Sequence, residues 1–165
     1  RQIGLEFDRN GEIARRGAIC RPLLDELNGM EFYHQSGPKS LGREWVETQV
    51  YPMLERYGLS LEDKLRTFYE HAAFQIFRII NANPSSAGNG KLLITGGGAF
   101  NKFLVERIEA LCPCQIVIPD RQIIEYKEAL IFAFLGALYM ADEPGCLASV
   151  TGASMDNIGG MLFKV

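Results

Sequence analysis

The stretch Thr95-Gly96-Gly97-Gly98-Ala99-Phe100-Asn101 decides how the second half of this chain is organised. It follows a short β-rich run, residues 91–94, and precedes an amphipathic helix predicted from about Phe100 to Leu111. The first-turn amides of a helix have no internal partner, and the helix dipole favours negative charge there. Glycines add close approach of the backbone and access to positive φ. The order strand, glycines, helix therefore predicts a phosphate-binding turn; the alternative is a tight turn that binds no ligand.

Two better-known nucleotide motifs are excluded. Asn101 stands where the dinucleotide fingerprint G-x-G-x-x-G requires its third glycine. The run Gly37-Pro38-Lys39-Ser40 lacks the glycine that a P-loop places immediately before its lysine. Lys39, Ser40 and Arg43 nevertheless place two cations and a hydroxyl around the start of a helix predicted from about Arg43 to Tyr57. They could contact an anionic sugar or phosphate, or they could form a solvated loop with a helix cap.

Composition sets the class of protein. The chain has 165 residues, 47% of them apolar and 22% charged, with a formal net charge of −3, which is typical of a globular domain with a core. The lack of a basic excess argues against a nucleic-acid partner. Four cysteines form neither a C-x-x-C pair nor a dense disulfide framework, and the histidines supply no metal motif, so we expect no metal site and a cytoplasmic location. The chain begins at Arg1 rather than at a methionine, and we expect it to be a fragment or a processed chain.

The predicted elements fall into a helical part, residues 1–83, and an α/β part, residues 91–165, of a single domain 1–165. The helical part contains short helices at 12–16 and 22–29, the helix at 43–57, and a long helix that starts after Ser60. Apolar residues recur on one face of that long helix, at positions 61, 65, 68, 72, 76 and 79. The loop 81–90 is the one candidate linker, and strands at 91–95 and 115–118 predict a parallel βαβ unit. So few strands make an incomplete sheet.

The last predicted helix, from about Glu125 to Ala141, contains the longest apolar stretch, residues 129–141. This stretch is shorter than the roughly 20 residues that cross a bilayer, so we expect no membrane partner and a helix buried on most sides. Glu128 lies at its N-terminal end. That carboxylate either stabilises the helix dipole or faces a cleft as a site residue.

Five groups of residues occur in a fixed order along the chain: Phe7-Asp8 with Gly11, Ala14 and Gly17; Pro38-Lys39-Ser40-Leu41-Gly42-Arg43-Glu44; Gly96-Gly97-Gly98-Ala99 with Asn101; Glu128-Ala129 with Phe132-Ala133; and Thr151-Gly152-Ala153. Together they resemble the C-terminal half of anhydro-N-acetylmuramic acid kinase, a bacterial sugar kinase of the actin-like ATPase superfamily. The resemblance spans nearly the whole chain. Leu41 departs from it, because the family usually has a threonine there.

The resemblance implies an α/β fold, the C-terminal part of an actin-like (ribonuclease H-like) ATPase domain, rich in helices with a small, incomplete, mostly parallel sheet. It implies ATP and Mg²⁺ as cofactors, and a reaction that opens the anhydro sugar with water and phosphorylates it for cell-wall (peptidoglycan) recycling. The implied roles are as follows: nucleotide binding by Gly96, Gly97, Gly98, Ala99 and Asn101; a sugar-side acidic position at Glu128; and a cleft wall at Lys39, Ser40 and Arg43.

The resemblance also indicates what the chain lacks. The family's glycine- and serine-rich phosphate loop and its aspartate base precede this region, and Asp8 belongs to a different motif. Phosphoryl transfer depends on positioning and electrostatic stabilisation from both sides of the phosphate, so we expect the chain alone to be inactive. The alternative is a non-catalytic nucleotide-binding or dimerisation module on an actin-like scaffold. A homodimer is the expected protein partner.

Overall fold

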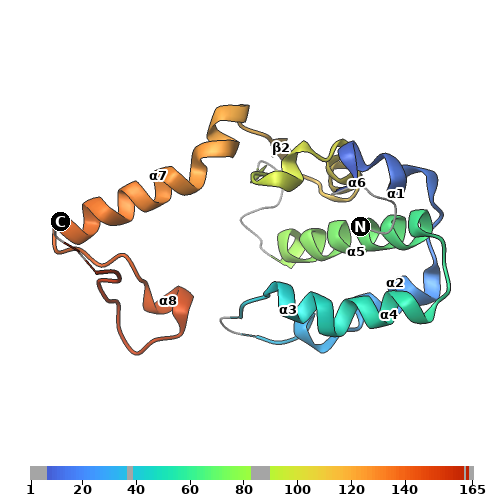
Figure 1. Ribbon diagram of the computed structural model, residues 1–165, viewed down its shortest axis with the longest axis horizontal. Coiled ribbons are helices and arrows are strands. Elements are labelled where there is room, and N and C mark those ends of the chain that lie inside the picture. Colours follow the sequence, from blue (N-terminus) through green and yellow to red (C-terminus); the bar gives the residue numbers. More distant parts are fainter. Residues whose placement is uncertain (1–6, 37–38, 83–89, 162, 164–165) are drawn as a thin grey trace. The chain divides into compact units, whose positions relative to one another are not determined.

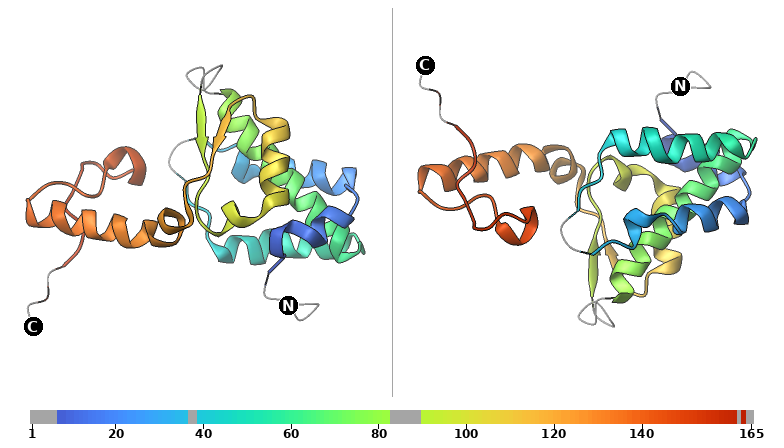
Figure 2. Two further views of the ribbon diagram at one scale, coloured as in Figure 1. Left: turned by 90° about the horizontal axis from the view of Figure 1, so that it is seen from above. Right: turned by 90° about the horizontal axis from the view of Figure 1, so that it is seen from below.

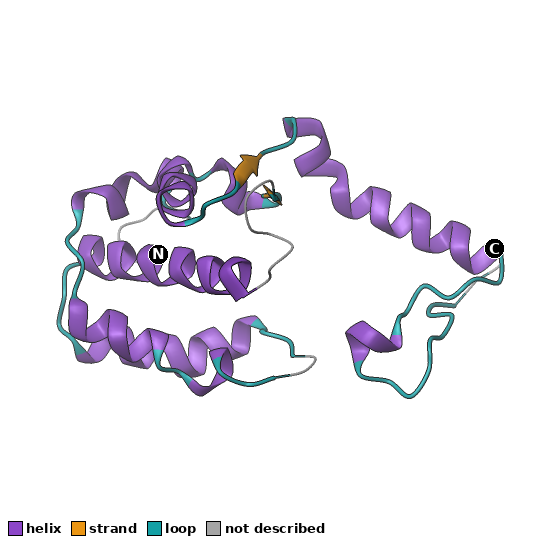
Figure 3. Cartoon of the chain, turned by 180° about the vertical axis from the view of Figure 1, so that it is seen from behind, coloured by secondary structure: helices purple, strands orange, loops and turns teal. Residues whose placement is uncertain are grey.

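The computed structural model describes residues 7–36, 39–82, 90–161 and 163 (Figure 1). The chain divides into two compact units, Arg1–Gln35 with Leu41–Asp120 and Ser36–Ser40 with Arg121–Val165, and each is described by itself. The helix-rich α/β class predicted from the sequence is confirmed (Figure 3). Of the predicted loop 81–90, residues 83–89 lie outside the described residues, as do Gly37 and Pro38.

The first unit is built around helix α5, Leu61–Ala82. Its start is as predicted, because the Ser60 hydroxyl accepts a hydrogen bond from the Asp63 amide at 3.1 Å and satisfies a first-turn donor. Helices α1 (Glu12–Arg16) and α6 (Lys102–Leu111) pack against α5, and α2 (Arg21–Asn28) packs on the opposite side (Figure 1). The long helix is therefore the centre of the unit.

The predicted apolar stripe on α5 describes only part of its burial, because Phe68 and Ile76 pack against the two apolar clusters but other faces of the helix are buried as well. The most buried side chains include Lys64, Thr67 and His71, whereas Ile79, at the end of the stripe, is 66% exposed. A helix covered from two sides buries residues around most of its circumference, so one amphipathic face is not what its packing requires. Thr67 fits because its hydroxyl donates to the Asp63 carbonyl and accepts from the Cys20 amide.

The segment between α1 and α2 runs directly against the first turns of α5. Gly17 ends α1 as predicted, in an extended conformation. The next amide, of Ala18, donates to the Asp63 carboxylate at 2.7 Å, and this bond is the main cause of the lowered pKa of Asp63. Helix α2 contains Pro22 in its first turn and is followed by Gly29, so both predicted boundaries are confirmed.

The helix predicted at 43–57 is present as one helical run with a wide turn in its middle. It consists of α3 (Arg43–Trp45), a π-helical turn (Val46–Val50) and α4 (Tyr51–Arg56). The π turn ends two residues before Pro52, which has no amide proton and cannot continue the normal hydrogen-bond ladder. Trp45, Val46 and Val50 of this run pack with Leu23 and Leu27 of α2 in one of the two apolar clusters of the unit.

The predicted βαβ unit is confirmed. Strands β1 (Lys91–Leu93) and β2 (Gln115–Val117) pair in parallel with Leu92 opposite Ile116, and α6 connects them (Figure 2). Leu92 and Ile116 pack with Ala73 of α5 and Ile108 of α6 in the second apolar cluster. The sheet has two strands among the described residues, which agrees with the predicted small sheet.

The second unit contains α7 (Arg121–Met140) and the short helix α8 (Ala148–Thr151). The predicted burial of α7 on most sides is wrong: Ile124 is its one buried residue, and Leu130, Phe132 and Phe134 are 69%, 71% and 62% exposed. The segment that follows α7 covers only part of one face, so apolar composition alone did not predict burial. No helix in the described part of the chain combines the length and apolar character needed to cross a membrane.

His71 gives the fold a specific acid sensitivity. It is 2% exposed, its Nδ1 lies 2.7 Å from the Asn28 side-chain oxygen, and burial lowers the pKa of His71 to about 4. In the unfolded chain His71 takes up a proton below its ordinary pKa of about 6.5, whereas in the folded chain it stays neutral until about pH 4. The stability that neutral His71 allows is therefore fully present above pH 6.5 and is lost as the pH falls towards 4. We expect the free energy of unfolding to fall by about 2 kcal/mol between pH 7 and pH 4.5 from this residue.

Urea titrations of the wild type and of His71→Gln over this pH range measure the effect. The variant should be less stable at pH 7, because the contact with Asn28 changes, but should lose less stability on acidification. His34→Gln is the matched control at an exposed histidine. An equal acid dependence of wild type and His71→Gln would contradict the assignment.

Candidate functional site

The glycine run forms a three-ten turn, Gly97–Phe100, between β1 and α6. Gly96, which precedes it, has φ 77° and ψ −178°, a conformation that essentially only glycine adopts. The Ala99 amide donates to the Gly96 carbonyl and the Asn101 amide to the Gly98 carbonyl, each at 3.0 Å. Among the described residues, no acceptor is found for the amides of Gly97 and Gly98. These two N–H groups are the donors that the turn offers to a ligand.

The space above the turn is open. A Cβ atom built on Gly96, Gly97 or Gly98 meets no atom within 4 Å. Packing therefore does not explain the glycines at 97 and 98, whose φ values are not positive. The hydroxyl oxygen of the adjacent Thr95 is buried and has no hydrogen-bond partner within the described residues. Unused amides, an unpartnered hydroxyl and open space together fit a polar ligand.

Ala99 and Asn101 form the inner side of the turn. Ala99 is 7% exposed. The Asn101 side chain caps α6 by accepting from the Leu104 amide at 3.0 Å, so α6 begins at Lys102 rather than near Phe100. The side-chain NH₂ group of Asn101 donates to the Tyr69 hydroxyl at 2.7 Å. Of the five predicted nucleotide-binding residues, the three glycines face the open side, and these two hold the turn in place.

Asp8 lies beneath the same turn. Its carboxylate accepts from the amides of Ile13 at 2.9 Å and Ala14 at 3.1 Å, at the start of α1, and from the Tyr69 hydroxyl at 3.2 Å. Gly11 has φ 74°, and a Cβ atom there would lie 2.5 Å from the Asn101 side-chain oxygen. The motif that begins at Asp8 is therefore a support for the turn, and its carboxylate is occupied by structural hydrogen bonds.

The predicted cleft-wall residues lie on the surface. Lys39, Ser40 and Arg43 are exposed, and Lys39 and Ser40 belong to the second unit whereas Arg43 starts α3 in the first. The Arg43 guanidinium donates to the Glu47 carboxylate one helical turn later at 2.6 Å, and this bond raises the pKa of Arg43.

Glu128 lies in the second turn of α7, since this helix begins at Arg121 and has no acidic residue in its first turn. The dipole explanation for Glu128 is therefore wrong, because that effect is confined to the first turn. The carboxylate is exposed, and no hydrogen bond or ion pair to it is found among the described residues. It is available for a ligand, together with the exposed apolar side chains around it.

A comparison with protein families decides the identity. The family model described as anhydro-N-acetylmuramic acid kinase matches residues 1–165. This chain belongs to the anhydro-N-acetylmuramic acid kinase family. The family is one of sugar kinases, phosphotransferases of amino sugar metabolism, and its name implies ATP and an anhydro amino sugar as substrates.

The structure explains why glycine stands at several positions of the motifs that resemble this kinase family. Gly11 and Gly17 are required by close packing, whereas Gly97 and Gly98 are not. Gly152 follows α8 in the left-handed conformation, with φ 74°. Sequence reasoning missed the role of Tyr69, which links Asp8 to Asn101; a single tyrosine on a helix gives no signal of such a contact.

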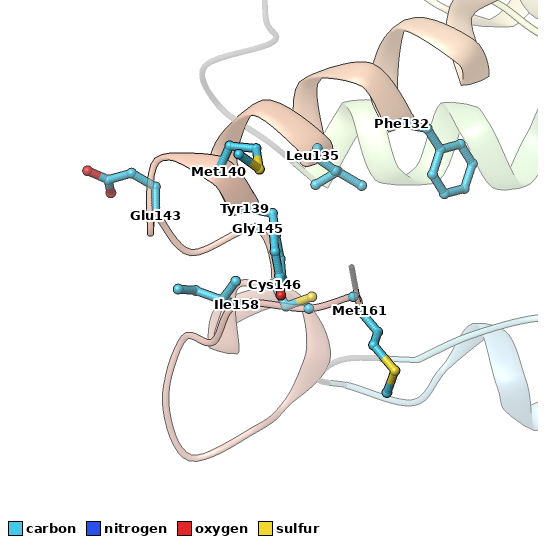
Figure 4. A pocket seen from close by; sticks show the side chains of 12 residues that line it. Phe132, Leu135, Tyr139, Met140, Glu143, Gly145, Cys146, Ile158 and Met161 are labelled. Carbon is cyan, nitrogen blue, oxygen red and sulfur yellow. The ribbon is translucent and has the colours of Figure 1, made fainter. Parts of the chain in front are cut away.

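The second unit also contains an apolar pocket of about 660 Å³ between α7 and the segment that follows it (Figure 4). Leu135 and Tyr139 line one side, and Cys146, Ile158 and Met161 line the other. The residues that line it include none of the predicted site residues.

A protein-only magnesium site does not fit the described residues. No group of three histidine, cysteine, aspartate or glutamate side chains comes together in them. The carboxylate of Asp8, which Tyr69 links to the turn in the structure, is already used by two amides and a hydroxyl. Mg²⁺ commonly binds through substrate phosphates and one or two carboxylates, so any metal here would arrive with the nucleotide.

Proposed function

We propose that this chain is the C-terminal lobe of an ATP-dependent anhydro-N-acetylmuramic acid kinase, with the nucleotide-binding turn and one sugar-side carboxylate. In the proposed reaction, water opens the anhydro bridge of the sugar and the γ-phosphate of ATP passes to the freed hydroxyl, in the recycling of cell-wall sugar in the cytoplasm. The observation that carries the proposal is the glycine turn, which has unused amides at Gly97 and Gly98 and open space above them.

The turn suits the adenosine side of a nucleotide. Two backbone N–H groups at the start of a helix supply donors at no conformational cost, because their positions are fixed by the bonds of Ala99 and Asn101. The absence of a Cβ atom at residues 96–98 lets a ribose or phosphate approach the backbone closely. Glu128, exposed and without an ion pair among the described residues, is the proposed sugar-side carboxylate.

Catalysis by phosphoryl transfer needs groups on both sides of the phosphate. The residues proposed here supply one side, and Mg²⁺ is proposed to enter bound to ATP. We therefore expect the chain alone to release no ADP and to form no sugar phosphate when it is incubated with ATP, Mg²⁺ and the anhydro sugar. Chromatographic detection of phosphorylated sugar above the level without protein would contradict this expectation.

A second candidate function is a non-catalytic dimerisation module on an actin-like scaffold. The exposed apolar side chains of α7, such as Leu130 and Phe132, favour it, because contiguous apolar surface commonly marks an interface. Light scattering across a dilution series distinguishes the candidates. A monomer at every concentration would exclude dimerisation as the role of this chain.

Calorimetric titration with a non-hydrolysable ATP analogue and Mg²⁺ tests the main proposal. We expect weak but saturable binding with one site per chain. The nucleoside adenosine, which carries no phosphate, should bind more weakly than the analogue if phosphate groups contact the turn. Absence of heat at millimolar analogue would contradict nucleotide binding by this chain.

A further inference from the structure

The hydroxyl group of Tyr69 joins three segments that are far apart in the sequence. It projects from α5, donates to the Asp8 carboxylate at 3.2 Å and accepts from the Asn101 side-chain amide at 2.7 Å. Asp8 in turn holds the start of α1 through two backbone amides, and Asn101 holds the start of α6 through the Leu104 amide. One hydroxyl therefore connects the two side chains that bind first-turn amides of α1 and α6.

The hydrogen-bond pattern permits one arrangement of these groups. The Leu104 N–H needs an acceptor, which sets the oxygen of the Asn101 amide towards α6 and its NH₂ group towards Tyr69. A carboxylate only accepts, so the Tyr69 hydroxyl donates to Asp8 and accepts from the side-chain amide of Asn101. The donor and the acceptor are therefore fixed in each of these hydrogen bonds.

The surroundings of Tyr69 keep this arrangement in place. Its ring lies against that of Phe103 on α6, with centroids 6.3 Å apart. Burial, with a smaller contribution from the Asp8 charge, raises the pKa of Tyr69 to about 12. The hydroxyl therefore stays protonated, and remains a donor to Asp8, at any pH at which a kinase would be assayed.

Asn101 is also the residue that closes the glycine turn, because its backbone N–H donates to the Gly98 carbonyl at 3.0 Å. A shift of Asn101 moves that carbonyl and the peptide units of Gly97 and Gly98. We propose that Tyr69 is a positioning residue, which holds Asn101 and thereby fixes the glycine turn in the geometry that binds the nucleotide. This inference rests on the proposed function of the turn.

Tyr69→Phe tests the proposal, because it keeps the ring and removes the hydroxyl. Tyr57→Phe is the matched control: the Tyr57 hydroxyl also donates to a carboxylate, that of Glu26, at 2.9 Å. We expect Tyr69→Phe, but not Tyr57→Phe, to speed hydrogen exchange of the Leu104 amide about tenfold and to weaken binding of the ATP analogue about five- to tenfold. Amide exchange is read by NMR and affinity by calorimetry, on the chain at equal folded fraction.

A double-mutant cycle separates positioning from general stability. If Tyr69 acts through Asn101, Tyr69→Phe should weaken nucleotide binding in the wild type but add no further loss in an Asn101→Ala background. Additive losses would overturn the proposal. So would unchanged exchange at Leu104 in Tyr69→Phe, or faster exchange with an unchanged affinity.

The proposed function can fail separately. If the wild-type chain binds no nucleotide, the proposed function is contradicted, and the exchange rates alone decide whether Tyr69 holds the turn. In that case, faster exchange at Leu104 confined to Tyr69→Phe supports the positioning role, and equal exchange in all variants overturns it.

Discussion

Gly17→Ala should lower the free energy of unfolding by about 3 kcal/mol and the melting temperature by about 10 °C. A Cβ atom at residue 17 would lie 2.1 Å from the carbonyl oxygen of Glu62 and 2.8 Å from the amide nitrogen of Asp63. Both are backbone atoms in the first turn of α5, so no side-chain rotation relieves the overlap. The extended conformation of Gly17 is open to any residue, so the cost comes from space and not from φ.

Gly97→Ala is the control for this prediction. Its glycine also belongs to a family motif, but a Cβ atom there meets nothing within 4 Å. The free energy of unfolding should therefore change by less than about 0.5 kcal/mol. Urea denaturation followed by circular dichroism compares the two variants. Equal stabilities of Gly17→Ala and wild type would show that α1 and α5 do not approach as described.

Gly97→Val should weaken binding of an ATP analogue by at least tenfold, about 1.4 kcal/mol, while the protein remains folded. The valine side chain fills the space through which a ligand would reach the amides of Gly97 and Gly98. Because the turn has no neighbour within 4 Å at this position, the melting temperature should stay within a few degrees of the wild type.

Thr48→Val serves as the matched control, since it places a valine at an exposed position on the helical run that contains α3 and α4. Its affinity for the analogue should equal that of the wild type, as measured by calorimetry. An unchanged affinity in Gly97→Val would mean that the nucleotide binds elsewhere or that the turn is structural only.

Local signals predicted most elements of the fold. Ser60 and Gly17 are a cap and a helix stop, and each acts where it was predicted. The strand, glycine and helix order gave the βαβ unit, because such order leaves few alternatives for the chain. The π-helical turn before Pro52 and the start of α6 at Lys102 depend on geometry that a pattern of residue types does not contain.

Burial was harder to predict than secondary structure. The stripe on α5 indicated one apolar face, but the helix is enclosed from two sides and also buries Lys64 and Thr67 outside that face. The apolar run of α7 indicated a buried helix, yet most of it is exposed in the described chain. Burial is decided by the elements that pack around a helix, and its own sequence carries little information about them.

The candidate site divides in the same way. The glycine turn was predicted from sequence because a run of glycines between a strand and a helix is visible as a pattern of residue types. The hydrogen bonds that hold the turn in place were not predicted, because Asp8, Tyr69 and Asn101 meet only through tertiary contacts. Family resemblance located Asp8 and Asn101 but gave no reason for their presence.

An NMR titration of the ¹⁵N-labelled chain with Mg²⁺ and a non-hydrolysable ATP analogue tests the central claim most directly. We predict saturable shifts that are largest at the amides of Gly97 and Gly98, smaller at Leu104, and absent at α2, which packs on the far side of α5. Saturable shifts that leave Gly97 and Gly98 unchanged, or no shifts at millimolar analogue, would contradict the claim that this turn binds the nucleotide.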